Sequence, residues 1–197
     1  MDRNKPYIAF QRQDALIVDN GFRNNYDKTR VLYDGRYCAV AGFIFAVVEG
    51  RYCVLANLRG NGTPDFQGYW NCPCGFLERG ENSQQGTARE TYEECGGFCV
   101  EPSQLKVVFV QTEPSECNNG NVTIHHTAFV GKQHHFSIYL RDRSFGGELN
   151  EVKMIAWIPV SDIDQYEWAF GHDKSIKQYA PSFFKRKLVE FYYRIFK

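Results

Sequence analysis

Two apolar runs with three residues between them are the feature of this sequence that most constrains its fold. Residues 37–48 and 52–58 are rich in β-branched and aromatic side chains, and Glu49-Gly50-Arg51 connects them. Runs of this kind form buried β-strands, and a short connection that contains glycine favours an antiparallel hairpin. The sequence therefore predicts a β-sheet at the centre of the fold.

The rest of the chain supplies further strands and three helices. Strand-like runs occupy residues 14–19, 106–111, 122–130, 135–138 and 154–158. A central helix is predicted after Asn82, because this residue can cap the first turn together with Gln85, and Gly96-Gly97 can end the helix in the left-handed conformation. Two more helices are expected over residues 172–179 and 182–196. Together these elements make an α+β domain with a mixed sheet.

The composition describes one globular domain with no strong overall field. The chain has 197 residues, of which 43% are hydrophobic, and no stretch rich in Pro, Gly or Ser divides it. Lys and Arg together number 23, as do Asp and Glu, so the net charge is zero and attracts neither nucleic acid nor anionic lipid. We therefore expect a single domain over residues 1–197, with an N-terminal extension over 1–36, a C-terminal helix over 180–197, and neither a nucleic-acid nor a membrane partner.

The apolar segments and the cysteines predict a cytoplasmic protein. The N-terminal residues lack the apolar core of a secretory signal, and the longest apolar run is shorter than the roughly 20 residues that cross a bilayer. Seven cysteines are an odd number, which favours reduced thiols over a disulfide framework. A zinc site built from Cys72, Cys74, Cys95 and Cys99 is disfavoured, because the spacing is poor for zinc.

The central helix carries an acidic cluster. Glu90, Glu93 and Glu94 share one helical face, and Glu81 lies in the loop before the helix. Like charges at this spacing repel one another by about 0.2–0.5 kcal/mol per pair, which favours a bound cation. Since the candidate ligands are all hard oxygen atoms, the expected ion is Mg²⁺ or Mn²⁺. The alternative is an acidic face that water solvates.

The spacing around this cluster favours the metal site. The pattern runs Gly75, five residues, Glu81, seven residues, Arg89-Glu90, two residues, Glu93-Glu94, one residue and Gly96. It resembles the signature of the Nudix hydrolases, and the similarity extends over about residues 40–179. The resemblance implies a Nudix-like α/β/α sandwich, in which the acidic helix packs on a mixed sheet. It further implies hydrolysis of a nucleoside diphosphate linked to another moiety, with water attacking a phosphorus of the pyrophosphate.

The resemblance also implies a role for each position of the pattern. Glu93 and Glu94 resemble the principal metal ligands, and Glu90 resembles a further ligand or the base that orients water. The Gly75 carbonyl is an implied ligand, Arg89 holds a glutamate in place, and Glu81 supports the loop. The sequence departs from the family pattern at Thr91 and Gly97, where aliphatic residues are usual, and at Cys74, where glycine is common.

Further candidates lie outside the pattern. Family members often add a carboxylate from another loop, and Glu151 is our first choice for it, with Glu148 second. Arg59 and Arg79 are predicted phosphate contacts, and Tyr69 is a predicted contact for the base. Trp70 is interpreted as a core residue.

Two other groups of residues are interpreted without a catalytic role. His125-His126 and His134-His135 are adjacent pairs, so at most one member of each pair on a strand can face a site. Residues 174–197 contain seven basic residues against one glutamate, with apolar residues between them. This segment is interpreted as an amphipathic helix that docks on the domain, in preference to a membrane or nucleic-acid site.

The substrate is expected to be a small nucleotide. Pro114 and the segment Ala169-Phe170-Gly171-His172 resemble features of ADP-ribose hydrolases of the family. Nucleoside triphosphates, dinucleoside polyphosphates and coenzyme derivatives stay open, as does a homodimer. The alternative function is a non-catalytic Nudix-fold sensor or binding module for nucleotide sugars.

Overall fold

The computed structural model describes residues 37–113, 115, 121–134, 137–139 and 150–196. Residues 37–197 form a compact unit. The predicted extension over residues 1–36, the strand predicted at 14–19, Pro114, His135 and Glu148 lie outside the described residues. No helix among the described residues is long and apolar enough to cross a membrane.

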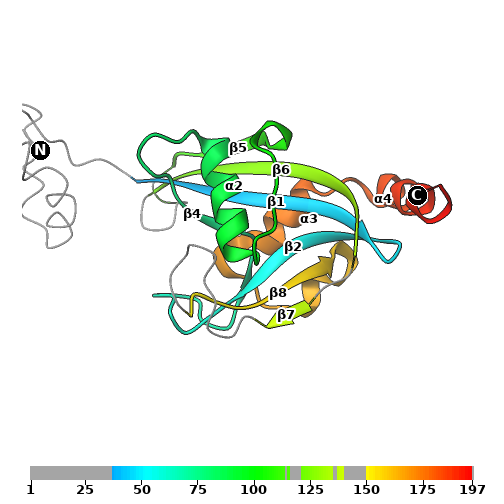
Figure 1. Cartoon of the computed structure of the whole chain (residues 1–197), viewed down its shortest axis with the longest axis horizontal. Helices are drawn as coiled ribbons and strands as arrows, with labels where there is room; N and C mark the ends of the chain where they lie inside the picture. Colours follow the sequence, from blue (N-terminus) through cyan, green and yellow to red (C-terminus); the bar gives the residue numbers. More distant parts are fainter. Residues whose placement is uncertain (1–36, 114, 116–120, 135–136, 140–149, 197) are drawn as a thin grey trace, which may run out of the picture. The chain divides into compact units, whose positions relative to one another are not determined.

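A mixed sheet forms the centre of the fold (Figure 1). Its strands, within the described residues, are β1 (Cys38–Val48), β2 (Arg51–Arg59), β3 (Trp70–Asn71), β4 (Cys74–Phe76), β5 (Lys106–Gln111), β6 (Val122–Gln133), β7 (Ser137–Tyr139) and β8 (Val152–Pro159). The main order is β5-β6-β1-β2-β8-β7, while β3 pairs with β2 and β4 with β1. β1 and β6 run parallel and their neighbours pair antiparallel, which confirms the predicted mixed sheet.

The predicted hairpin joins β1 and β2. Val48 pairs with Arg51 across a two-residue turn, and the turn residues Glu49 and Gly50 have φ angles of 49° and 75°. Positive φ at both positions is typical of the turn that matches the twist of paired strands. The prediction therefore holds, although β2 already begins at Arg51 and the connection is one residue shorter than expected.

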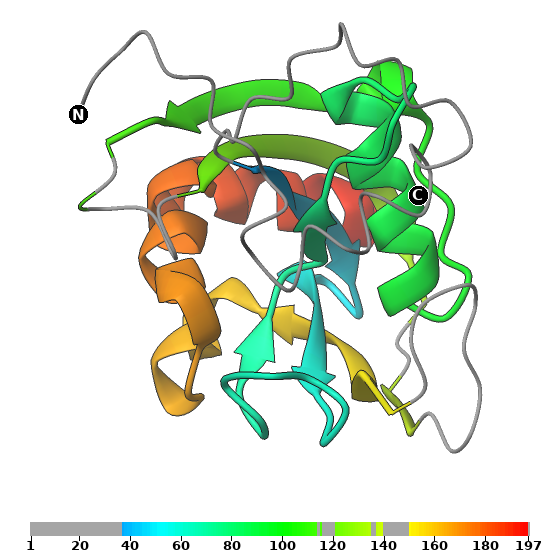
Figure 2. The same cartoon turned by 90° about the vertical axis from the view of Figure 1, so that its left-hand side faces the viewer.

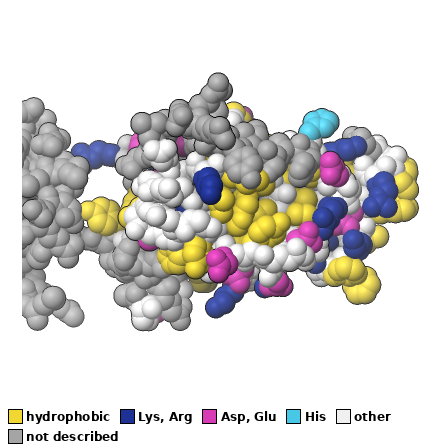
Figure 3. All heavy atoms as spheres, turned by 90° about the horizontal axis from the view of Figure 1, so that it is seen from below, with side chains coloured by type: hydrophobic (Ala, Val, Ile, Leu, Met, Phe, Trp, Pro, Cys, Tyr) yellow, Lys and Arg dark blue, Asp and Glu magenta, His cyan; other side chains and the backbone are white. Residues whose placement is uncertain are grey.

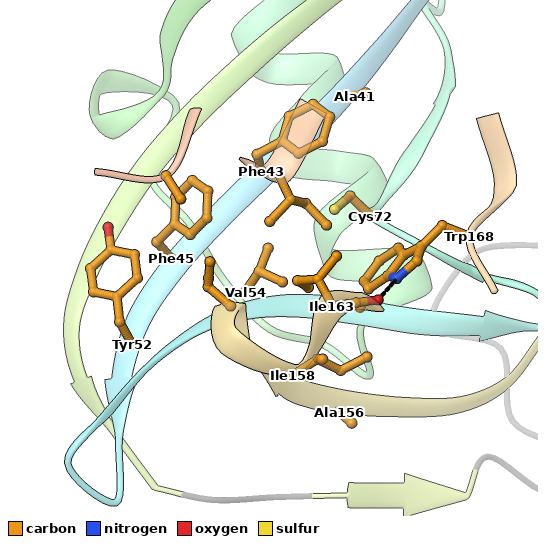
Figure 4. Packing of buried hydrophobic residues seen from close by; sticks show 14 of the residues in the cluster. Ala41, Phe43, Phe45, Tyr52, Val54, Cys72, Ala156, Ile158, Ile163 and Trp168 are labelled. Carbon is orange, nitrogen blue, oxygen red and sulfur yellow. Dashed lines mark hydrogen bonds between the residues drawn. The ribbon is translucent and has the colours of Figure 1, made fainter. Parts of the chain in front are cut away.

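β1 is apolar along its length because both of its faces are buried. Phe43, Phe45 and Val47 point into one core cluster, while Ile44 and Ala46 point into the other. Figure 4 shows the first cluster, in which residues of β1, β2 and β8 meet Ile163 and Trp168. Successive strand residues point to opposite faces, so a strand between two cores reads as a continuous apolar run.

Helices cover the two faces of the sheet, as the predicted sandwich requires. α2 (Ser83–Glu94) lies over β1, β4 and β6, while α3 (His172–Tyr179) and α4 (Phe183–Ile195) border the first core cluster. Figures 1 and 2 show α2 and α3 on opposite sides of the sheet. Three 3₁₀ helices, at Pro102–Gln104, Val160–Gln165 and Ala169–Gly171, complete the described elements.

The sequence signals for α2 correspond to observed contacts. Asn82 Oδ1 accepts a hydrogen bond from the Gln85 N–H, and Gln85 Oε1 accepts one from the Asn82 N–H, both at 2.9 Å. Gly96 and Gly97 adopt positive φ after the helix. Gly86 weakens a helix by propensity, but a Cβ at this position would lie 2.6 Å from Leu77 Cδ2. The close approach of the preceding loop therefore explains the glycine.

The short strands β3 and β4 were not predicted as separate strands. The structure pairs residues 70–71 with β2 and residues 74–76 with β1. Strands of two and three residues contain too few positions for alternation to be detected. Their pairing matters for function because β4 holds Gly75 beside α2.

Candidate active site

Glu94 is buried where the apolar face of β2 becomes polar. Residues of β2 that face α2 are Cys53 and Leu55, followed by the buried Asn57. Asn57 Nδ2 donates to Glu94 Oε2 at 3.1 Å, and the backbone N–H of Cys74 donates to the same oxygen at 2.9 Å. β2 and β4 therefore fix this carboxylate, whose residue is only 4% exposed.

Glu90 lies one turn earlier on α2 and contacts Gly75. A Cβ added to Gly75 would overlap the Glu90 carboxylate, so a side chain at this position would displace that group. Gly75 does not have a positive φ. The requirement for glycine is therefore space for Glu90 and not a special backbone conformation.

Arg89 links the glutamates of this region. Its guanidinium donates two hydrogen bonds to Glu81, at 2.8 and 3.1 Å. Its Nη1 also donates to Glu90 at 2.8 Å and to Glu93 at 3.0 Å, and its Nη2 donates to the Phe76 carbonyl at 2.9 Å. The fork of one arginine thus joins three carboxylates to β4.

Burial and mutual repulsion oppose ionisation of the inner glutamates. Burial, together with the charges of Glu93 and Glu151, raises the pKa of Glu90 to about 7 despite the opposing effect of Arg89. Burial also raises the pKa of Glu94, and Glu90 and Glu151 add to this effect. By contrast, hydrogen bonds from Arg89 lower the pKa of Glu81. The inner carboxylates therefore favour a nearby positive charge beyond that of Arg89.

Glu151 belongs to the same electrostatic group. It lies just before β8, and its carbonyl accepts a hydrogen bond from the Gly60 N–H at 2.7 Å. Its charge acts on the pKa of both Glu90 and Glu94. The structure therefore brings this loop carboxylate to the face of α2 that carries the acidic cluster, from 57 residues beyond Glu94 in the sequence.

The donor set fits a hard divalent cation. Among the described residues, no three His, Cys, Asp or Glu side chains form a preassembled metal cage. Mg²⁺ does not need such a cage, because it is usually held by one or two carboxylates together with waters and substrate phosphates. Glu90, Glu93, Glu94 and Glu151 supply carboxylate oxygens. Burial raises the pKa of Glu90 and Glu94, so a nearby cation would favour their charged forms. These residues fit Mg²⁺ or Mn²⁺.

The predicted phosphate contact Arg59 has structural partners. Its Nη2 donates to Asp65 at 2.6 Å, its Nε donates to the Asp65 carbonyl at 3.1 Å, and its guanidinium lies 4.9 Å from the centre of the Phe170 ring. The residue is buried. These contacts join the end of β2 to the loop that follows it and to the 3₁₀ helix at Ala169–Gly171, while binding of phosphate by Arg59 stays a prediction.

The other two predicted substrate contacts lie in two different loops. Tyr69 packs its ring against Phe66, with 5.7 Å between the ring centres. Arg79 is exposed in the loop between β4 and α2. Trp70 packs partly buried against the first core cluster, which confirms its interpretation as a core residue.

The adjacent histidines face opposite sides of the sheet. His126 is buried beneath α2, where its ring nitrogens lie 3.0 Å from the hydroxyls of Thr87 and Ser83. His125 Nδ1 lies 2.7 Å from the Tyr179 hydroxyl on the side of α3. The absence of a catalytic role for either histidine stays a prediction.

Sequence reasoning missed Asn57 as a functional neighbour. Its signal was present, because an amide in the run Val54-Leu55-Ala56-Asn57 is unusual in a strand that is otherwise buried and apolar. Thr91, where the family pattern usually has an aliphatic residue, is fully buried. The Thr91 hydroxyl donates to the Thr87 carbonyl at 2.7 Å, so the buried polar group is satisfied.

Comparisons with known proteins identify the family. The model of the NUDIX domain matches residues 37–179, which is most of the chain. The protein therefore belongs to the Nudix family. None of the curated proteins matches the sequence.

Solved structures share the fold at low identity. The NUDIX domain of Shewanella oneidensis NrtR complexed with ADP ribose is 23% identical with a TM-score of 0.58, and the match covers 81% of this chain and 95% of that one. A MutT/nudix family protein from Enterococcus faecalis is 21% identical with a TM-score of 0.51, over 75% and 52%. NrtR complexed with a 27mer DNA is 22% identical with a TM-score of 0.50, over 72% and 59%. The chain thus spans little more than half the length of these last two proteins.

Proposed function

We propose that the protein is a metal-dependent pyrophosphohydrolase that acts in the cytoplasm on a nucleoside diphosphate linked to another moiety. The observation that carries the proposal is the pair of buried glutamates, Glu90 and Glu94, next to the charge of Glu151. Buried carboxylates that repel one another reduce stability unless a cation compensates them. Such an arrangement is typical of a site that functions with a bound ion.

The proposed chemistry assigns work to each residue. Glu93 and Glu94 would hold the ion, with Glu90 and the Gly75 carbonyl as further ligands. A bound divalent ion neutralises phosphate oxygens and lowers the pKa of the attacking water. Arg89 positions Glu90 and Glu93 through its hydrogen bonds, and Glu81 orients Arg89 in turn. Glu151 is our proposed base, which would accept the proton of the water that attacks phosphorus.

A substrate related to ADP-ribose is the finer part of the proposal. The NUDIX domain of NrtR in the structural comparison is complexed with ADP ribose, which contains a pyrophosphate between two ribosyl groups. The Phe170 ring, in the segment that resembles ADP-ribose hydrolases, contacts the Phe66 ring edge to face, with 4.9 Å between the ring centres. Arg59 and Tyr69 adjoin these rings and are the proposed contacts for phosphate and base.

A non-catalytic sensor is the second candidate, because NrtR is also seen with DNA. The two functions differ in turnover. A screen of ADP-ribose, nucleoside triphosphates, dinucleoside polyphosphates and coenzyme derivatives with Mg²⁺ and Mn²⁺ separates them. We expect metal-dependent release of nucleoside monophosphate or phosphate from at least one compound, and Glu93→Gln should remove it. If a compound binds tightly but is not hydrolysed in the presence of either metal, the sensor function is favoured.

The assignment of the base has its own test. Glu151→Gln should lower kcat by roughly a hundredfold to ten-thousandfold and leave KM nearly unchanged, because a base acts on the attacking water more than on substrate binding. Glu148→Gln, three residues earlier in the sequence, is the matched control and should have a mild effect. The opposite pattern would move the role to Glu148, and two mild effects would move it to Glu90. A rate profile over pH distinguishes a lost base from a lost ligand, since loss of the base removes the acidic limb.

A further inference from the structure

α4 docks on the domain through one narrow face. Val189 and Tyr193 pack against the first core cluster, and Glu190 Oε1 accepts a hydrogen bond from the backbone N–H of Tyr52 at 2.9 Å. Arg186 Nη1 donates to the Pro181 carbonyl at 2.7 Å. These positions recur every three or four residues, so they lie along one side of the helix. The predicted docking of an amphipathic helix is therefore observed on this side.

The opposite side of α4 is apolar and exposed. Phe184, Leu188, Phe191 and Ile195 are 79%, 69%, 58% and 54% exposed. Their spacing of four, three and four residues places them in one stripe, which points away from the face with Val189 and Tyr193. Large apolar side chains gathered in this way on a surface mark a site of interaction.

Cations border the exposed stripe. At about 100° per residue, Lys187 and Arg194 lie along one edge and Lys185 along the other. The one carboxylate of α4, Glu190, belongs to the docked face, where its side chain is 12% exposed and accepts a hydrogen bond from Lys187 Nζ at 2.7 Å; the Lys187 side chain is itself 59% exposed. Figure 3 shows hydrophobic and Lys or Arg side chains next to one another at the end of the molecule that α4 occupies in Figure 1. The outward surface of the helix is thus apolar with positive edges.

We propose that α4 binds reversibly to the surface of an anionic phospholipid bilayer, an activity independent of the proposed hydrolysis. The apolar stripe would enter the boundary between headgroups and acyl chains, and the flanking cations would contact acidic headgroups. This arrangement is the one that helices lying in a membrane interface use. This proposal revises the expectation that the protein has no membrane partner. That expectation assumed that the apolar residues of α4 are all used in docking on the domain.

Two other occupants fit the surface less well. A second copy of the chain that packed stripe against stripe would bring Lys185, Lys187 and Arg194 close to like charges. A nucleic acid would place phosphates against the centre of the surface, where the side chains are Leu188, Phe191 and Ile195 and not cations. An anionic bilayer offers acyl chains to the apolar stripe and acidic headgroups to the cations at its edges.

Vesicle binding of the full-length protein tests the proposal. We compare sedimentation with vesicles of phosphatidylcholine and with vesicles of phosphatidylcholine mixed with phosphatidylserine. The expected affinity is roughly a hundredfold higher on the mixed vesicles, since each cation near an anionic surface contributes about fivefold. This preference should fall as salt is raised. Lys185→Gln with Lys187→Gln should lose most of it, while Lys106→Gln with Lys153→Gln, exposed lysines of β5 and β8, should keep it.

The apolar stripe has a matched test. Phe184→Ser with Phe191→Ser should reduce binding to mixed vesicles by roughly a hundredfold or more, because each exposed aromatic ring then loses its burial in lipid. Val108→Ser with Val110→Ser changes exposed apolar residues of β5 and should bind as wild type does. Thermal melting of each variant verifies that the domain is folded.

Three outcomes would overturn the proposal. They are the absence of binding to either type of vesicle, undiminished binding of the variant altered at Phe184 and Phe191, and a dimer in sedimentation equilibrium that this variant dissociates. The third outcome would assign the surface to a second copy. Since none of these substitutions alters a residue of the candidate active site, loss of vesicle binding with unchanged turnover separates this proposal from the proposed function.

Discussion

Helices α2 and α4 lie on opposite faces of the sheet and differ from the usual distribution of residues in opposite ways. The buried residues of α2 are Gly86, Thr87, Glu90, Thr91 and Glu94, none of which is a large apolar residue. α4 is much more apolar, yet it has no fully buried residue. Burial of charge lowers the stability of the fold. Apolar surface that stays exposed contributes none of the stabilisation that its burial would give. Both helices thus retain features that folding alone does not favour, and such features are where function is expected.

The largest effect should come from the buried charge of α2. Glu94→Gln should lower turnover of the best substrate by roughly a thousandfold or more, since a bound ion is worth several kcal/mol of transition-state stabilisation. The melting temperature of the metal-free variant should be equal to or above that of wild type, because glutamine still accepts from Asn57 and Cys74 without a buried charge. Turnover assays and thermal melting check both parts. Wild-type turnover would contradict the metal-site assignment.

Titration should separate the two faces of the sheet. The pKa of Glu90, on the α2 side, is raised to about 7, so the folded protein holds a proton that the unfolded chain has released. Stability of the metal-free protein should therefore fall as pH rises from about 4.5 to about 7, by about 3 kcal/mol from this group. On the α3 side, burial lowers the pKa of His125 to about 4. Stability from His125 is present above pH 6.5 and is lost as pH falls toward 4, by a similar amount.

Single variants expose these opposite slopes. Relative to wild type, metal-free Glu90→Gln should gain stability as pH rises through this range, and His125→Phe should gain stability as pH falls. The measurement is urea unfolding at several pH values, with the slope on denaturant used to verify the same unfolding transition. Parallel curves for wild type and either variant would show that the group concerned titrates alike in folded and unfolded chains.

Substitution of Gly75 should be poorly tolerated, because β4 packs closely against α2 at this position. Gly75→Ala places a methyl group on the Glu90 carboxylate and should destabilise the protein by about 1–3 kcal/mol. Turnover should fall as well, because the displaced carboxylate belongs to the proposed site. Adding Glu90→Ala provides space for the methyl group, so the double variant should recover stability but not turnover. Equal stability of the Gly75→Ala variant and wild type would show that Glu90 moves without loss.

The smallest effects are expected from substitutions on the two sides of α4, measured as changes in the free energy of unfolding. Val189→Ala removes part of a side chain that packs against the core and should cost about 1 kcal/mol of unfolding free energy. Leu188→Ala, its neighbour on the exposed side, should stay within about 0.5 kcal/mol of wild type. Urea unfolding of both variants measures the difference. If Val189→Ala and Leu188→Ala destabilise the protein equally, the exposed apolar stripe of α4 is buried in solution. That result would favour a contact that the protein makes in the absence of lipid.

The local elements of the fold were predictable because their signals are local. Asn82 and Gln85 predicted the start of α2, and the observed strand β5 and helix α3 have the predicted bounds. β6 extends three residues beyond the expected end at Val130, and β8 extends the expected strand at both of its ends. The residue at which a strand ends depends on its neighbours in the sheet. The sequence of the strand alone does not specify those neighbours.

Capping, alternation and motif spacing act between residues near one another in the chain, so the strands, the acidic helix and the Nudix pattern could be predicted from the sequence. The contacts of Asn57 and Cys74 with Glu94, and of Arg59 with Asp65 and Phe170, join distant segments and became visible only in the folded structure. The same is true of the side of α4 that meets the core. An amphipathic pattern shows that a helix has an apolar side, but α4 is apolar on two sides, and only packing against β1 and β2 selects between them.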